Sequence, residues 1–316
     1  MKKILSRFTD LINFTAITGL LLAYASPYVN PQDFWPIAFF GLNFQLLGIF
    51  NVLLIIIWIK RKKKRVFYNL LVFIIGLPYF NRNFQFNNEP LGGEKFSIVS
   101  FNTHVQSVYN GGNTTQDIQD YLIDKDVELA VLLEWLDGKG SISKDAFPHQ
   151  QFVALNTKRN KHRYGLNFVS KYPIAHWEQI RYSNFSNNLA AFFDVELEDQ
   201  TVRVITVHLQ SNGVKSSDYQ EFITGIDNKK VQQKAKRLIG RLKDSFQKRA
   251  SQVKIIEEVI EESPYPVLVV GDFNDTPQSY AYESLRGQRK DAFVEQGSGM
   301  GSTYRKPIEL LRIDYI

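Results

Sequence analysis

The chain has 316 residues, which is long enough for one substantial domain and one smaller folded segment. Of these residues 44% are hydrophobic and 14% aromatic, a composition that excludes a disordered chain. It contains no cysteine, which excludes disulfides, thiolate zinc sites and a cysteine nucleophile. The formal net charge is +6, but ten of the 38 basic residues lie before residue 83, where acidic residues are few. The rest of the chain is close to neutral, so the basic charge belongs to the N-terminal segment.

Three apolar stretches occupy the first eighty residues, at about residues 11–29, 35–59 and 66–80. A helix needs about 20 apolar residues to cross a bilayer. The first two stretches approach or exceed that length, while the third is the shortest and ends at Asn81 and Arg82. The pattern therefore predicts a transmembrane anchor over residues 1–82 with two or three spanning helices.

The basic residues around these stretches predict how the anchor is oriented. Lys2, Lys3 and Arg7 precede the first stretch, and the run from Lys60 to Arg65 separates the second from the third. The positive-inside rule places both groups in the cytoplasm, so the remaining domain faces outward, toward a periplasm or the cell exterior. A nuclear-localisation or nucleic-acid patch is the alternative for the basic run, and a cleaved signal peptide is the alternative for the first stretch. Apolar stretches on both sides of the basic run disfavour the first alternative, and the two apolar stretches that follow the first one disfavour a cleaved signal peptide. We therefore expect a multi-pass protein of the cell membrane.

Residues 83–94 contain a proline and two glycines and are predicted to be a linker to a domain over residues 95–316. Short apolar segments and amphipathic segments alternate in that domain. Strands are expected at residues 95–101, 128–133, 150–156, 165–170, 188–197, 201–209, 266–270 and 310–316, and helices at 115–124, 228–262 and 278–285. This mixture predicts an α/β fold with two packed sheets covered by helices.

Polar side chains stand directly at the ends of several of these apolar strands, where sheet proteins commonly assemble a site. They are Asn102, Glu134, His208, Asp272 and Asn274. Taken alone, the glutamate is more typical of a strand terminus, the asparagines and the GDFND segment are typical of turns, and the histidine is about as often structural as functional. Their order along the chain is the stronger signal.

The motifs around these residues form an ordered series. They are SFNTH (100–104), LLEW (132–135), SKYPI (170–174), TVHLQS (206–211), GDFNDTP (271–277) and RIDYI (312–316). Over about residues 95–316 the series resembles the endonuclease/exonuclease/phosphatase superfamily, which includes DNase I-like nucleases, sphingomyelinases and inositol polyphosphate 5-phosphatases. The resemblance implies a DNase I-like four-layer α/β/β/α sandwich, here preceded by the transmembrane helices.

The resemblance also implies a mechanism, in which a hard divalent cation assists attack of water on a phosphate ester. It places Mg²⁺, with Mn²⁺ as the alternative, on Glu134 and Asn102, because these cations prefer oxygen ligands. Asp272 is then the base that takes the proton of the attacking water. Asn274 binds phosphate or water, and His208 donates to a phosphoryl oxygen in the transition state.

Two positions depart from the family pattern. Leu133 stands where the family usually has glutamine before the metal-binding glutamate. Asp314 matches the aspartate that normally orients a histidine further along, yet all five histidines of the chain precede it. We therefore expect a C-terminally truncated sequence with low or no activity over residues 1–316, with a natural inactive variant as the alternative.

The substrate class stays open at this point. A near-neutral domain disfavours indiscriminate binding to nucleic-acid phosphates, whereas a membrane anchor brings phospholipids within reach. We expect a nuclease-like phosphodiesterase first, a sphingomyelinase-like enzyme or inositol-phosphate phosphatase second, and an inactive membrane-anchored binding module third. Phosphodiester or phosphomonoester substrates and the membrane are the expected partners, and no protein partner is indicated. The basic helix at 228–262 is a solvated face or a contact for anionic substrate or lipid headgroups, and Thr303 and Tyr304 are candidate pocket residues.

Overall fold

The computed structural model describes residues 2–61, 64–87, 96–155, 164–182, 188–213, 228–304 and 311–316. Internal contacts divide the chain into two compact units. The helical unit comprises residues 1–88, 212–251 and 275–313, and the sandwich unit comprises residues 89–211, 252–274 and 314–316. Residues 212–251 and 275–313 thus group with the N-terminal segment, which the sequence pattern did not indicate. The division into anchor, linker and domain at residues 82 and 95 stays a prediction.

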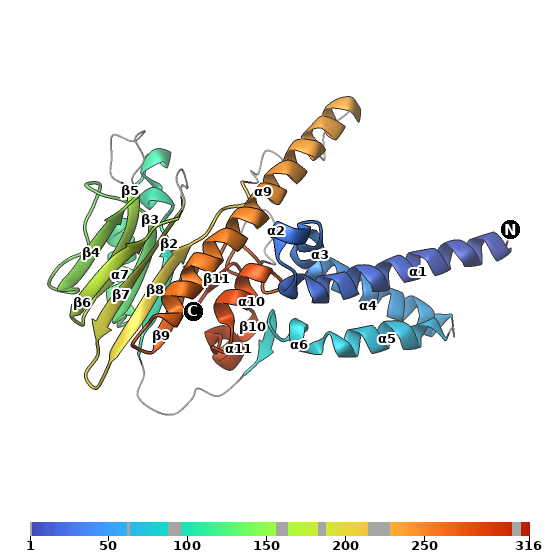
Figure 1. Cartoon of the computed structure of the whole chain (residues 1–316), viewed down its shortest axis with the longest axis horizontal. Helices are drawn as coiled ribbons and strands as arrows, with labels where there is room; N and C mark the ends of the chain where they lie inside the picture. The colour runs from blue at the N-terminus through green and yellow to red at the C-terminus, as the bar shows by residue number, and fades with distance from the viewer. Residues whose placement is uncertain are drawn as a thin grey trace. The chain divides into compact units, whose positions relative to one another are not determined.

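Two β-sheets form the sandwich unit (Figure 1). The four-stranded sheet has the order β2-β3-β5-β4, and the five-stranded sheet has the order β11-β9-β8-β7-β6. Their bounds are β2 Ile98–Asn102, β3 Leu129–Leu136, β4 His149–Ala154, β5 Tyr164–Ser170, β6 Ile174–Ile180, β7 Leu189–Glu196, β8 Thr201–His208, β9 Val267–Asp272 and β11 Asp314–Tyr315. The pairs β2–β3 and β8–β9 are parallel, and the other neighbouring pairs are antiparallel. The predicted α/β class with two sheets is therefore confirmed.

The core of the sandwich unit lies between the two sheets, because alternate side chains of each strand point to the same face. Leu189, Ala191, Phe193 and Val195 of β7 are all buried there together with residues of β3, β5, β8 and β9. The rings of Phe168 and Phe193 stack with centroids 3.9 Å apart. The outer face of the four-stranded sheet is covered by α7 (Thr115–Asp124), at the bounds that the sequence predicts.

The predicted strands are present, and three differences concern the ends and edges of the sheets. β6 was not expected, because the apolar and polar residues of its IAHWEQI sequence do not alternate regularly, and most of this edge strand is exposed. β11 covers only two residues of the expected strand at 310–316. Residues 84–86 of the predicted linker form β1 (Phe84–Phe86), which pairs with β10 (Ser298–Met300) in the helical unit. Residues 88–94 of that linker lie outside the described part of the chain.

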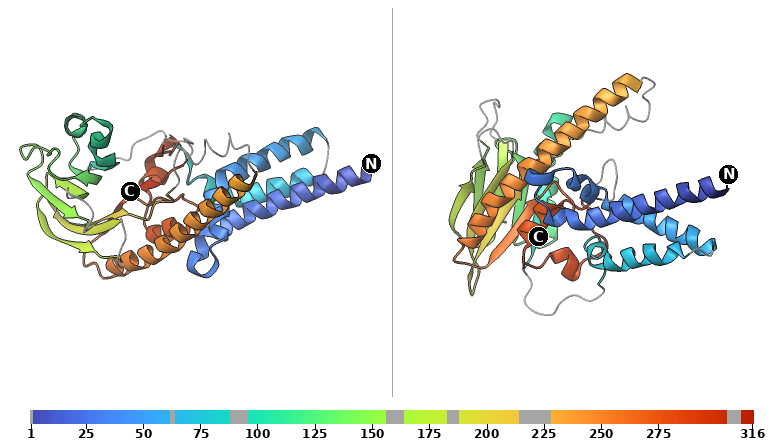
Figure 2. Two further views of the ribbon diagram at one scale, coloured as in Figure 1. Left: turned by 90° about the horizontal axis from the view of Figure 1, so that it is seen from above. Right: turned by 45° about the vertical axis from the view of Figure 1, so that its right-hand side comes forward.

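Three apolar helices of the helical unit run side by side, α1 (Lys2–Ala25), α4 (Phe44–Lys60) and α5 (Arg65–Ile75) (Figure 2). Leu20, Tyr24, Phe44 and Val72 are buried between them. A polar contact also joins all three, because the Asn13 side-chain oxygen accepts hydrogen bonds from Trp58 Nε1 at 2.6 Å and Asn69 Nδ2 at 2.8 Å. Hydrogen bonds between side-chain amides commonly stabilise the packing of apolar helices.

The structure describes one helix that is long and apolar enough to cross a membrane, Arg7–Tyr28, while α4 and α5 are shorter apolar helices. The second predicted stretch is divided at Asn43, which lies between α3 (Ile37–Leu42) and α4 and whose side chain donates to the Phe39 carbonyl at 2.8 Å. Asparagine competes with the helix backbone in this way and interrupts helices. The number of spanning helices and their orientation stay predictions.

Short elements complete the helical unit. They are η1 (Ser26–Tyr28), α2 (Pro31–Phe34), α6 (Leu77–Phe80), α10 (Tyr280–Arg286), α11 (Ala292–Gln296) and the first part of α9 (Asn228–Glu261). Phe246 of α9 packs edge-on against Phe39 of α3, and Lys243 lies over the ring of Trp35. The end of α9 belongs to the sandwich unit, where the Gln252 side chain accepts a hydrogen bond from the Gln210 backbone N–H at 2.9 Å.

Candidate active site

Three of the six predicted site residues lie in one row across the five-stranded sheet. His208 of β8 is the register partner of Asp272 of β9, and Asp272 is the register partner of Asp314 of β11. Side chains in register on neighbouring strands point to the same face. The same row continues to Leu189 of β7, which is buried between the sheets. His208, Asp272 and Asp314 therefore point toward the four-stranded sheet.

Glu134 comes from that opposite sheet and approaches the row. Its Oε1 lies 3.8 Å from His208 Nε2 and 3.1 Å from the Asn102 side-chain nitrogen, which donates to it. The backbone of Glu134 has φ +53° at a bulge of β3 between Leu132 and Trp135. Positive φ is unfavourable for a glutamate, so the surrounding structure must hold the backbone in this conformation. The bulge turns this side chain out of the regular alternation of β3.

Two residues that the sequence analysis missed hold this bulge. The buried Thr103 hydroxyl lies within hydrogen-bonding distance of the Leu133 and Glu134 carbonyl oxygens, at 2.9 and 3.0 Å. The fully buried Gln106 side chain accepts from the Leu136 N–H at 2.9 Å and donates to the Leu136 carbonyl at 3.2 Å. These two side chains replace ladder hydrogen bonds that a bulge loses. Polar residues just after a strand end were the only sequence signal for them.

The Gly271-to-Asn274 turn fixes the other carboxylate. A Cβ on Gly271, whose φ is +143°, would lie under 3.0 Å from backbone atoms of Val207, so this strand end requires glycine. Asp272 is buried, and its Oδ1 accepts a hydrogen bond from the Asn274 N–H at 2.8 Å. Asn274 has φ +52°, and its side chain donates to the Leu209 carbonyl at 2.9 Å. The structure thus brings Asp272 and Asn274 together with the end of β8.

Burial sets the charge of His208. The loss of solvent lowers the pKa of its imidazole, and the carboxylates of Glu134 and Asp314 oppose this only in part. A histidine with a lowered pKa is neutral near pH 7 and keeps one N–H donor and one acceptor nitrogen. The approach of His208 and Glu134 is therefore a contact between a neutral ring and a carboxylate.

The donor atoms at Glu134 and Asn102 fit a hard cation. Mg²⁺ is usually held by one or two carboxylates and completes its shell with water and substrate phosphate. The Glu134 side chain is 24% exposed, so water and substrate can reach it. The structure holds no group of three or more His, Cys, Asp or Glu side chains in the described ranges that could bind a metal by themselves.

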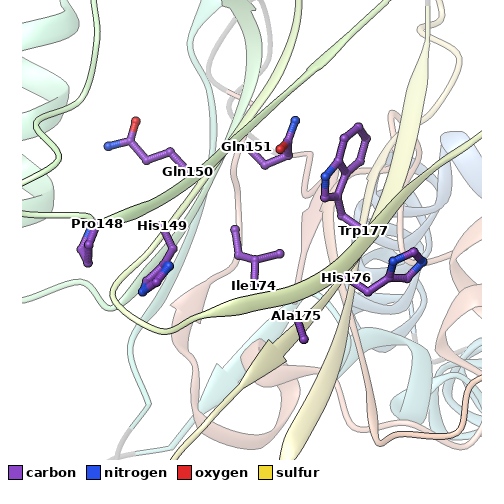
Figure 3. A pocket seen from close by; sticks show the side chains of 8 residues that line it. All are labelled: Pro148, His149, Gln150, Gln151, Ile174, Ala175, His176 and Trp177. Carbon is purple, nitrogen blue, oxygen red and sulfur yellow. The ribbon is translucent and has the colours of Figure 1, made fainter.

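A cavity in the sandwich unit lies away from these residues. It has a volume of about 500 Å³ and is lined by residues of the edge strands β4 and β6, including His149, His176 and Trp177 (Figure 3). None of the six predicted site residues lines it. Carboxylates, an imidazole and amides converge instead in the Glu134–His208 region, which is therefore the candidate site. Thr303 and Tyr304 belong to the helical unit, and their pocket role stays a prediction.

Comparison with known proteins agrees with the motif series. Residues 99–316 match the Endonuclease/Exonuclease/phosphatase family, and residues 3–83 match a domain of unknown function. No protein with curated annotation matches significantly. Similar solved structures include beta toxin from Staphylococcus aureus, with 17% identity, a TM-score of 0.41 and coverage of 62% of this chain and 72% of that one.

Two further structures have comparable similarity. Sphingomyelinase C from Streptomyces griseocarneus has 17% identity and a TM-score of 0.43, covering 63% of this chain and 71% of that one. D. rerio TDP2 complexed with single strand DNA product has 16% identity and a TM-score of 0.49, covering 71% and 83%. The family match alone spans most of the chain. The chain therefore belongs to the endonuclease/exonuclease/phosphatase family and is a hydrolase of phosphate ester bonds.

Proposed function

We propose that this protein is a membrane-anchored, divalent-metal-dependent phosphodiesterase of nuclease-like type. The observation that supports it most is the row of His208, Asp272 and Asp314 facing Glu134 from the opposite sheet. Two packed sheets present acid, base and amide groups to one place, as in-line attack of water on a phosphate ester requires.

Glu134 and Asn102 would hold the Mg²⁺ ion, with Mn²⁺ as the alternative. Bound there, the cation supplies positive charge that neutralises the phosphoryl oxygens. The Asn102 side-chain oxygen accepts from the His104 N–H at 3.0 Å, and its amide nitrogen donates to Glu134. These hydrogen bonds orient the carboxylate that binds the ion, and such supporting contacts commonly change metal affinity 10- to 100-fold.

The other residues act on water and phosphate directly. Asp272 takes the proton from the attacking water. The hydrogen bond that it accepts from the Asn274 N–H orients its carboxylate. Asn274 binds phosphate or water without adding negative charge. The neutral His208 donates its N–H to a phosphoryl oxygen as negative charge develops there. Asp314 lies beside Asp272 in the row. Its negative charge raises the pKa of His208 and so opposes part of the lowering by burial.

The substrate class is tested by a panel of phosphate esters. The product of the intact gene, reconstituted in phospholipid nanodiscs, would be assayed with Mg²⁺ against single-stranded DNA, duplex DNA, RNA, sphingomyelin and inositol phosphates. The proposal expects the highest kcat/KM on a nucleic acid. Preference for sphingomyelin or an inositol phosphate would select the lipid-directed alternative, to which apolar helices in the same chain lend support. No turnover of any ester would favour the inactive binding module.

The membrane orientation is tested separately. A reporter that is active only outside the cytoplasm would be fused after Asn87, with a second fusion after Arg61 as the matched control. Activity after Asn87 and none after Arg61 is the expected result, because Lys60 to Arg65 should stay inside. The reverse pattern would overturn the orientation, and activity at neither site would overturn the outward-facing domain.

A further inference from the structure

The apolar helices of the helical unit expose apolar side chains to their surroundings. Ile49, Leu53 and Ile57 follow one another at four-residue spacing along α4, so they share one face of that helix, and they are 42–51% exposed. Ile74 and Ile75 of α5 are 58% and 53% exposed. Soluble proteins rarely leave large apolar patches uncovered. These faces suit helices that lie in lipid, as the proposed membrane anchor requires.

Aromatic side chains with polar tips lie toward both ends of these helices. At one end the Arg65 guanidinium lies 4.7 Å from the centre of the Trp58 ring. At the other end the rings of Tyr24 and Tyr79 stack with centroids 5.0 Å apart, and the Tyr79 hydroxyl donates to that of Tyr28 at 3.3 Å. Tryptophan and tyrosine are enriched at the two surfaces of a membrane. We therefore expect one membrane surface near Trp58 and the other near the tyrosine cluster of Tyr24, Tyr28 and Tyr79.

The first part of α9 is attached to the helical unit at the end that carries the tyrosine cluster (Figure 1). Leu238, Leu242 and Phe246 recur at four-residue spacing and pack against residues of α3, which are Ala38, Phe39 and Leu42. The Gln32 side chain of α2 donates to the Ser251 hydroxyl at 2.8 Å. Because α2 and α3 follow closely after Tyr28 in the chain, they hold this part of α9 near the membrane surface that the cluster marks.

This part of α9 is strongly basic. Residues 228–251 contain nine lysine and arginine residues and one acidic residue, whereas the sequence from residue 90 onward is close to neutral as a whole. Lys234, Arg237 and Lys248 are exposed. They lie on one side of the helix, because the first two are three residues apart and the last two are 11 residues, or about three turns, apart. Ile239 of the same helix is 46% exposed, and exposed basic and apolar side chains together are typical of helices that bind a membrane surface.

We propose that residues 234–248 of α9 bind anionic lipid headgroups of the membrane in which the apolar helices lie. Lys234, Arg237 and Lys248 pair with the phosphate groups of a lipid such as phosphatidylglycerol, and Ile239 contacts the boundary between headgroups and acyl chains. Each basic residue near an anionic membrane surface favours binding about fivefold. The inference rests on the membrane anchoring in the proposed function and is independent of the assignment of catalytic residues.

A nucleic acid is also a polyanion, but the place of these basic residues favours lipid. Their helix is joined to α3 by buried apolar side chains, so a membrane that holds the apolar helices stays within reach of it. A ligand held nearby in this way binds at a high effective concentration, whereas a nucleic acid has to be captured from solution. Lipid headgroups are therefore the ligand that the helical unit itself brings to α9.

Hydrogen exchange in nanodiscs tests the lipid contact. The product of the intact gene would be compared in phosphatidylglycerol and in phosphatidylcholine, which differ in net charge. We expect the backbone amides of residues 231–247 to exchange at least about fivefold more slowly in phosphatidylglycerol, because headgroup contacts stabilise this part of the helix against opening. The difference should disappear in about 1 M KCl, where the Debye length falls to about 3 Å. Equal exchange in the two lipids at low salt would overturn the inference.

Arg237→Glu and its control Lys290→Glu separate a contact on α9 from a general effect of charge. Both residues are exposed and belong to the helical unit, and each substitution reverses one charge. Arg237→Glu should remove most of the exchange difference between the two lipids, and Lys290→Glu should keep it. A difference that survives Arg237→Glu, or that both substitutions reduce equally, would contradict the assignment to α9.

A label at residue 239 reports the membrane contact independently. The chain contains no cysteine, so Ile239→Cys, with Lys290→Cys as its control, carries a single fluorophore. The neutral quencher acrylamide should quench the label at residue 239 at least about threefold less in phosphatidylglycerol than in phosphatidylcholine, because the side chain enters the interface. The label at residue 290 should be quenched equally in both. If single-stranded DNA protects residue 239 and phosphatidylglycerol does not, the surface binds nucleic acid and the lipid inference is wrong.

Vesicle flotation distinguishes this inference from the anchor itself. Protein that floats with both lipids and shows no difference at α9 would overturn the inference alone. Protein that floats with neither lipid would overturn the anchor of the proposed function and the inference with it.

Discussion

The two sheets of the sandwich contribute to the candidate site in different ways. The five-stranded sheet places His208, Asp272 and Asp314 by ordinary strand register. The four-stranded sheet places Glu134 by breaking its register at a bulge with positive φ, which Thr103 and Gln106 hold. A regular row needs only the ladder that forms the sheet, whereas a distorted strand needs support from side chains that take no part in the chemistry. Substitutions on the two sides should therefore fail differently.

The largest effect is expected on the regular side. Asp272→Asn keeps the shape of the side chain and removes the base, so kcat should fall about 10³-fold, within the range typical of general bases. The unfolding temperature should change little, because the amide oxygen can still accept from the Asn274 N–H. Asp199→Asn, in an exposed turn of the same unit, is the control and should leave kcat unchanged. Asp272→Asn with more than a tenth of the original kcat would remove Asp272 from the role of base.

A supporting residue on the distorted side should give a smaller loss of activity together with a loss of stability. Gln106→Ala leaves the Leu136 N–H and carbonyl without their buried partner, which costs about 1–3 kcal/mol of unfolding free energy. Because Glu134 then loses its imposed position, kcat should fall about 10²-fold. Denaturant unfolding and steady-state kinetics measure the two effects.

Gln150→Ala is the matched control for that substitution. Its side chain also bridges backbone carbonyls, of Ile142 and Phe147, but none of the predicted site residues is among its partners. We expect a comparable loss of stability with kcat within about twofold of the original, since its local effect on the backbone is of the same kind. If Gln150→Ala lowers kcat as much as Gln106→Ala, the support of Glu134 by Gln106 would be indistinguishable from general destabilisation.

The smallest effect should come from Thr103→Val, which preserves the shape of the side chain and removes one hydroxyl. Gln106 still holds the strand beyond the bulge, so kcat should fall only about 3- to 10-fold, the equivalent of one neutral hydrogen bond. Thr103→Ser retains the hydroxyl and should recover most of the loss. Equal kinetics for valine and serine would show that packing at this position, and not the hydrogen bond, supports the bulge.

Hydrophobic periodicity and motif order predicted several strands, one helix and the candidate site residues. The strands carrying His208 and Asp272 were predicted because apolar runs such as VLVV lead directly into the polar site residue. The helix at 115–124 was predicted with its observed bounds, since its apolar residues recur at helical spacing and polar segments flank it. β6 was missed because the apolar residues of this exposed edge strand do not recur with a period of two.

The supports of the site were beyond sequence reasoning for a different reason. Thr103 and Gln106 act on backbone groups some 30 positions away, and no local pattern reports such a contact. The second apolar stretch breaks at Asn43, where a side-chain hydrogen bond to the backbone is present that a hydrophobicity pattern does not report. Long-range contacts and local competition for backbone groups decided these features.

The central claim is that Glu134 binds the cation of a metal-dependent phosphodiesterase, and a magnesium activation curve tests it most directly. Hydrolysis of a phosphodiester would be followed against Mg²⁺ concentration for the product of the intact gene and for Glu134→Gln. We expect no turnover with a chelator present and a half-activating Mg²⁺ concentration raised at least about tenfold by the substitution, because one of few protein ligands loses its charge. Turnover that persists with the chelator, or one activation curve shared by both proteins, would contradict it.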